Sequence, residues 1–170
     1  MIAAMALSVF IGGRRSLAEE RSRVEALFYT DPESSISIQS DLEYIGATAN
    51  NLKTVALRYL SVDDPYIVQL NSCRNALDAA KSLEEKHDAA SELFSVVEAL
   101  YTHLDPAQYD MNSTDRSFRA SLYEDFQSAM KRMEENDYNV SAREFNQMLS
   151  SSFTGFIAAF TGIDEIPIYG

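Results

Sequence analysis

Residues 38–59 read IQSDLEYIGATANNLKTVALRY, and this stretch decides the fold class. Its apolar side chains recur at alternating steps of four and three residues, and they are Ile38, Leu42, Ile45, Ala49, Leu52, Ala56 and Tyr59. This spacing places them along one edge of an α-helix, as in the seam of a coiled coil. The sequence therefore predicts a long helix that packs against other helices.

Three further long segments carry helical patterns, and proline-containing stretches such as Asp31-Pro32 and Asp105-Pro106 separate them. We predict helices over 14–29, 33–61, 65–104 and 115–150, then a short apolar segment at 153–160 that stops at Gly162, and an extended end. Short links imply antiparallel neighbours. The expected fold is all-α, an up-and-down antiparallel four-helix bundle of long helices with a short apolar C-terminal helix or tail.

The same periodicity predicts which side chains form the core of the bundle. In the segment 65–104, the inward stripe includes Cys73, His87 and Phe94. In the segment 115–150, the expected inward residues are Phe118, Leu122, Phe126, Ala129, Met133 and Val140.

Composition and charge limit the classes of function. The chain has 170 residues, enough for one domain with an adequate core, and 46% of them are hydrophobic. The formal net charge is −12, and such an acidic chain repels phosphate backbones, so nucleic acid is not an expected partner. Cys73 is the single cysteine, so an internal disulfide cannot form.

The N-terminal run at 2–13, IAAMALSVFIGG, contains no charged residue, and Arg14-Arg15 follow directly. As a helix the run would span about 18 Å, whereas a hydrocarbon core is about 30 Å thick. An apolar run followed by arginines is the order of a membrane helix that leaves on the cytoplasmic side. We expect residues 1–13 to be the remnant of an N-terminal membrane anchor and 14–170 a single cytoplasmic domain; the alternative is a short apolar start that packs on the bundle.

No motif predicts catalysis. Glu84 and His87 have the Glu-x-x-His spacing of a di-metal bundle, but the second copy is missing because Leu100 stands three residues before His103. Cys73 is expected to be a buried structural thiol. Phosphate-binding loops and nucleophile motifs are absent from the sequence. We therefore predict no enzymatic activity, no catalytic residue, no metal site and no cofactor.

Two aromatic patterns near the C-terminus are candidates for a partner-binding or packing stripe. Tyr138-Asn139 and Phe145-Asn146 repeat at a seven-residue spacing, which is two helical turns. Phe153, Phe156, Ile157 and Phe160 form a compact apolar face. We expect both sets mainly to pack within the bundle. Docking onto a partner helix, or for the second set a membrane, is the alternative.

These features together resemble the LemA family of bacterial membrane-anchored proteins. The resemblance rests on the repeated aromatic-Asn pairs, the apolar tail from Phe156 through Gly162 to Pro167, the stretch from Asn51-Leu52 to Tyr59, Arg74, and the apolar start. Glu135 and the segment 107–119 depart from the family pattern. The resemblance implies a long-helix bundle on the cytoplasmic side of a single anchor, and it supplies no activity.

Three hypotheses about function follow. The first is a membrane-tethered helical scaffold or adaptor that binds a protein partner, with homo-oligomerisation also open. The second is a helical sensor or small-ligand-binding bundle, and the third is a di-metal bundle oxidoreductase.

Overall fold

The computed structural model describes residues 2–30 and 36–169, and across these residues it is all-α, with seven helices and no strand. The predicted break at Asp31-Pro32 lies outside the described residues. Contacts divide the chain into two compact units, which are described separately. The first comprises Met1–Ile38 and Glu134–Tyr169, and the second comprises Gln39–Met133.

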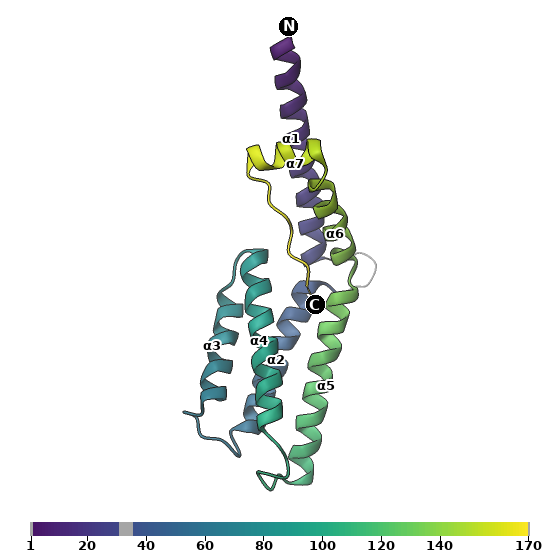
Figure 1. Ribbon diagram of the computed structural model, residues 1–170. Coiled ribbons are helices and arrows are strands. Elements are labelled where there is room, and N and C mark those ends of the chain that lie inside the picture. Colours follow the sequence, from purple (N-terminus) through teal and green to yellow (C-terminus); the bar gives the residue numbers. More distant parts are fainter. Residues whose placement is uncertain (1, 31–35, 170) are drawn as a thin grey trace. The chain divides into compact units, whose positions relative to one another are not determined.

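The first unit contains α1 (Ile2–Tyr29), α6 (Asp137–Leu149), α7 (Ser152–Thr161) and a C-terminal segment without helix (Figure 1). Helix α1 is continuous through Gly12-Gly13, and its buried side chains Leu17, Val24 and Phe28 follow helical spacing. Contacts join α1 to both α6 and α7. Gly162 ends α7 with a φ of 66°, the left-handed conformation expected from the sequence.

The second unit contains α2 (Ile38–Ala56), which begins at its boundary, α3 (Pro65–Ala79), α4 (Leu83–His103) and α5 (Ser113–Glu135). The predicted seam of α2 is confirmed from Ile38 to Ala56, because all six of its apolar residues there are buried. Pro65 occupies the first turn of α3, as predicted, and Asp64 caps this helix by accepting a hydrogen bond from Tyr66 N at 2.9 Å.

The prediction of one helix over 65–104 is wrong, because the chain breaks between α3 and α4. Ala80 has extended backbone angles, and Ser82 begins α4 with a capping box. The Ser82 hydroxyl accepts from Glu85 N at 3.1 Å, while the Glu85 carboxylate accepts from Ser82 N at 3.2 Å and Lys81 N at 2.8 Å. These bonds satisfy N–H groups that a helix start leaves open, so the break is stabilised locally.

The prediction of one helix over 115–150 is wrong for the same kind of reason. Asn136 has extended angles and caps α6 by accepting from Tyr138 N at 3.0 Å. The break resets the helical phase, so Val140 is exposed rather than inward. The chain therefore has seven helices in its described part, where four long ones and a short C-terminal helix or tail were expected.

Phe118 also differs from its prediction, since 54% of it is exposed. The buried stripe of α5 runs from Met133 and Phe126 back to Arg119 and Asp115, one position away from Phe118. Arg119 lies with its guanidinium 3.7 Å from the centre of the Tyr101 ring and donates to Tyr101 O at 2.7 Å. Polar residues with specific partners therefore take the inward positions at this end of α5.

Candidate functional site

The two asparagines of the aromatic-Asn repeat hold the C-terminal segment of the first unit. Asn139 donates to Tyr169 O at 2.6 Å and accepts from Tyr169 N at 2.9 Å. Asn146 donates to Ile166 O and accepts from Ile166 N, both at 2.8 Å. Each amide thus pairs with both main-chain groups of one residue, as a neighbouring β-strand would. We call these two pairs the asparagine clamps.

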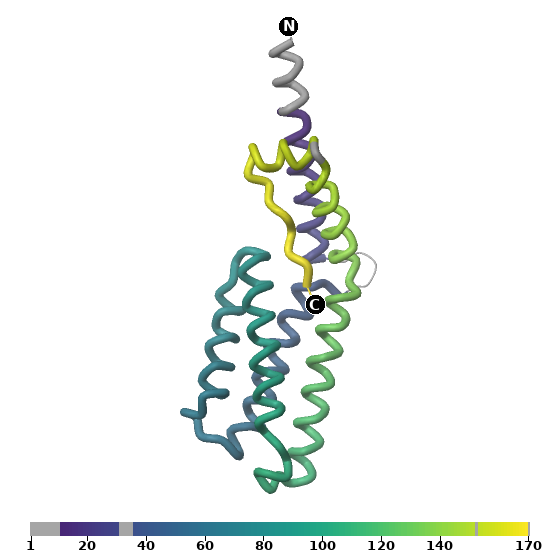
Figure 2. The backbone as a smooth tube through the Cα atoms, in the orientation of Figure 1, coloured from purple at the N-terminus to yellow at the C-terminus, as the bar shows by residue number. Residues whose placement is uncertain are grey.

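The spacing of the clamps follows from helix and chain geometry. Seven residues along α6 rise about 10.5 Å, and three residues of extended chain span about 10 Å. Asn139 pairs with Tyr169 and Asn146 with Ile166, so the segment runs antiparallel to α6. Figure 2 traces this return of the chain from α7. The seven-residue repeat therefore matches a three-residue step in the bound segment.

The aromatic partners of the repeat are packed in the interior. Tyr138 is fully buried, and its hydroxyl donates to Pro167 O at 2.9 Å. Its ring lies 5.6 Å from Phe28 and 5.9 Å from Tyr169, with ring planes at 70° and 65°. Such edge-to-face contacts add to the stabilisation from burial. Phe145 is buried as well, so this half of the candidate stripe packs within the first unit.

The second half of the candidate stripe divides between the interior and the surface. Ile157 is buried, whereas Phe153, Phe156 and Phe160 are 60%, 58% and 74% exposed. The expectation that this face packs inward therefore holds for Ile157 alone. We call the three phenylalanines the α7 aromatic face. Exposed aromatic side chains grouped on one helix are typical of an interaction surface.

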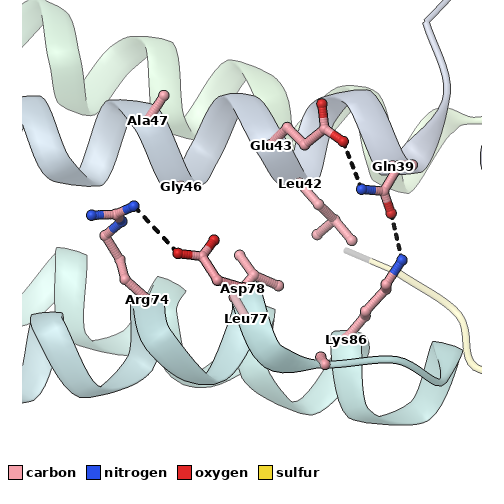
Figure 3. A pocket seen from close by; sticks show the side chains of 10 residues that line it. Gln39, Leu42, Glu43, Gly46, Ala47, Arg74, Leu77, Asp78 and Lys86 are labelled. Atoms are coloured by element: carbon pink, nitrogen blue, oxygen red, sulfur yellow. Dashed lines mark hydrogen bonds and ion pairs between the residues drawn. The ribbon is translucent and has the colours of Figure 1, made fainter.

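The second unit has a pocket of about 400 Å³ between α2 and the α3–α4 pair (Figure 3). Its lining combines apolar residues with polar and charged ones. The lining residues are Gln39, Leu42, Glu43, Gly46, Ala47, Arg74, Leu77, Asp78, Ala80 and Lys86. The volume is in the range of small-molecule sites. No sequence motif indicated this pocket, because its residues come from three helices and one inter-helix break.

The polar groups of the pocket form two short networks. Lys86 donates to the Gln39 side-chain oxygen at 2.6 Å, and Gln39 in turn donates to Glu43 at 2.7 Å. Burial lowers the pKa of Lys86, while Glu43 opposes that change. Arg74 forms an ion pair with Asp78 at 3.6 Å, and its buried Nε has no hydrogen-bond partner among the described residues. The pocket thus presents two cations and two carboxylates among apolar residues.

A second polar cluster links the turn after α2 to the start of α5. The buried Asp115 carboxylate accepts from the Tyr59 hydroxyl at 2.6 Å and from Asn112 Nδ2 at 2.8 Å, and it pairs with Arg58. These donors, Tyr59 above all, lower the pKa of Asp115, and the same bond raises the pKa of Tyr59. Protein groups supply the hydrogen-bond donors of this carboxylate, so the cluster holds the turn after α2 against the start of α5 and has a structural role.

The remaining sequence candidates lie apart from these features. His87 is half-buried and lies 3.1 Å from Asp88. Within the part of the chain that the structure describes, no three histidine, cysteine or acidic residues are grouped to hold a metal ion. Cys73 is buried, and burial raises the pKa of its thiol, so the neutral form dominates.

No family model matches this chain, and no curated protein matches it. Across residues 2–30 and 36–169, none of the helices combines the length and the apolar composition that a bilayer-spanning helix needs. The evidence on function is therefore the geometry of the two units.

Proposed function

We propose that the protein is a membrane-tethered helical adaptor without enzymatic activity that binds a protein partner on the cytoplasmic side of the membrane. In this proposal the chain is a member of the LemA family, and the uncharged run at 2–13 lies in the bilayer. Helices α2–α5 form an up-and-down four-helix bundle that presents the partner surface. The acidic charge favours a protein partner over a nucleic acid.

The observation that carries the proposal is the continuity of α1. One helix contains the uncharged run, the exposed Arg14 and Arg15, and then the buried Leu17, Val24 and Phe28. A helix that is uncharged at one end and packed into a folded unit at the other can hold that unit at a fixed height above a bilayer. The arginines at the junction match the charge bias of cytoplasmic flanks.

Fractionation of cells that produce the full chain tests the tether. We expect the protein to stay in the membrane pellet after an alkaline carbonate wash. Ile11 is 58% exposed, so Ile11→Asp leaves folding intact but opposes insertion, and it should move the protein to the soluble fraction. Val62→Asp, at a residue 64% exposed in the second unit, is the matched control and should stay in the pellet. Wild-type protein in the soluble fraction would refute the tether.

Site-directed photocrosslinking tests the partner surface. A photoreactive residue placed at Val68, which is 54% exposed on α3, should crosslink in intact cells to one or a few discrete proteins. A discrete adduct that the same probe at Ile11 does not give supports the adaptor, since Ile11 belongs to the proposed bilayer region. Equal, diffuse crosslinking at both positions contradicts it.

The pocket supports a second candidate function, the binding of a small charged molecule. Arg74 and Lys86 can bind a carboxylate or phosphate, and Glu43 or Asp78 an amine. A ligand that binds only the folded state raises its melting temperature. A panel of dicarboxylic acids and amino acids should contain a stabilising compound whose effect Arg74→Met abolishes. A panel without any effect would exclude these ligand classes.

A further inference from the structure

Helix α7 has a surface that its own unit does not cover. The α7 aromatic face consists of three phenylalanines spaced by three and four residues, so they share one side of the helix. The Phe156 and Phe160 rings lie 5.2 Å apart, so two of the three rings adjoin each other. The helix packs through the adjoining side, where Ile157 and Ala158 are buried.

The place where α7 contacts α1 is defined by a glycine. A Cβ atom added to Gly13 would lie 2.6 Å from Ile157 Cδ1, so the absence of a side chain allows the close approach. Figure 1 shows α7 running across α1. Gly13 is the last residue of the uncharged run, and Arg14 is the first charged residue of the chain. The crossing therefore lies at the boundary between the apolar and the charged parts of α1.

Both threonine hydroxyls of α7 donate to main-chain carbonyls. The helix contains no charged residue between Ser152 and Thr161. The Thr161 hydroxyl donates to Ile157 O at 2.8 Å, and the Thr154 hydroxyl donates to Met148 O. A threonine whose hydroxyl bonds to nearby main chain can enter an apolar medium at little cost.

We infer that α7 is an in-plane membrane helix whose aromatic face lies in the headgroup–acyl boundary of the lipid surface. This inference rests on the proposed tether and adds that the bilayer contacts the protein at a second element. Aromatic side chains favour this depth, and the arginines at the junction lie at the level of the phosphates. Helix α7 crosses α1 at Gly13, next to the first charged residue of α1. The aromatic face therefore lies at the depth where the charge boundary of α1 would independently place the lipid surface. This agreement favours lipid over a protein occupant.

The absence of tryptophan from the chain permits a direct test. Phe156→Trp places a single fluorophore on the aromatic face, and Phe118→Trp is the matched control. The two phenylalanines have similar exposures of 58% and 54%, and Phe118 belongs to the second unit. Each full-length variant is reconstituted with phosphatidylcholine vesicles containing a minority of phosphatidylglycerol. Fluorescence is then recorded with ordinary and with brominated lipids.

We expect the Phe156→Trp emission to shift to the blue and to be quenched several-fold by brominated lipids, with the Phe118→Trp emission unchanged. Adding Phe153→Ser and Phe160→Ser to Phe156→Trp should remove most of the quenching while the protein still sediments with vesicles. Sedimentation without quenching of Phe156→Trp overturns the inference and leaves the tether standing. Failure to sediment overturns the tether and the inference together. A blue-shifted emission without lipid, at a concentration where the protein is oligomeric, assigns the face to a second copy and overturns the inference.

Discussion

Replacement of Asn139 by alanine removes one asparagine clamp and tests whether the clamps hold the C-terminal segment. The Asn139 side chain is fully buried and takes part in three hydrogen bonds to main chain. Two join it to Tyr169, at 2.6 and 2.9 Å, and the third donates to Glu134 O at 3.1 Å. Alanine leaves all three main-chain groups without this partner.

The expected cost follows from these three bonds. A neutral hydrogen bond contributes about 1 kcal/mol net, and a buried group left unsatisfied costs about 1–3 kcal/mol. We expect Asn139→Ala to lower the local stability of the segment by about 3 kcal/mol. Asn146→Ala removes two bonds at a half-buried position, where water can replace the amide, so about 1–2 kcal/mol is expected.

Hydrogen exchange is the suitable assay because it reports on the segment separately from the second unit. A loss of about 3 kcal/mol corresponds to roughly 100-fold faster exchange of the Tyr169 amide when opening and closing are fast compared with the exchange step. Peptides from α3 and α4 should exchange at unchanged rates. Exchange at Tyr169 within about threefold of wild type, a difference under 1 kcal/mol, would refute the assignment of the clamp.

Further predictions concern the core, two glycines and one buried carboxylate. Phe126→Ala should lower the unfolding free energy by about 3–5 kcal/mol in urea titration, since Phe126 is fully buried. Gly46→Ala should stabilise α2 by about 0.5–1 kcal/mol, because the nearest atom to the added methyl group is 4.0 Å away. Gly155→Ala should destabilise the protein by about 1–3 kcal/mol, because its methyl group would lie 2.6 Å from Leu149 O. Thermal melts of the glycine variants should therefore shift in opposite directions. The lowered pKa of Asp115 makes its contribution present at neutral pH and lost as acidification passes below about pH 4, a dependence that acid unfolding should show and that Asp115→Asn should remove.

The helical class and much of the core followed from periodicity. The alternating steps from Ile38 to Ala56 placed every seam residue correctly, because burial on one side of a helix imposes that spacing. Pro65 and Gly162 were also placed correctly, since each restricts the backbone in a known way.

The helix breaks at Ser82 and Asn136 were missed although the first carried a signal. Ser82 and Glu85 have the Ser-x-x-Glu spacing of a capping box, but the apolar stripe continued across them and outweighed it. Asn136 offered only a residue type that favours caps. Hydrophobic periodicity also cannot show that Asp115 and Arg119 take inward positions, because their burial depends on partners distant in sequence.

The candidate site was predicted in part. The aromatic-Asn repeat was recognised as a stripe, but its asparagines bind main chain, and main-chain partners leave no pattern in the sequence. The pocket with Arg74 and Lys86 arises from the α3–α4 break, so missing the break also hid the pocket.

The asparagine clamps limit which insertions and substitutions the C-terminal segment can tolerate in evolution. The two amides bind main-chain atoms, so they fix the spacing of the clamped residues, while burial of the Ile166 and Tyr169 side chains restricts which residues can stand there. One residue inserted between Ile166 and Tyr169 would prevent the two pairs from forming together. Position 167 tolerates its proline, because Tyr138 binds only the main-chain carbonyl there. A proline at position 166 would remove the main-chain N–H that donates a hydrogen bond to Asn146. Relatives of this chain should therefore share two asparagines seven residues apart and, in the terminal segment, two buried side chains three residues apart.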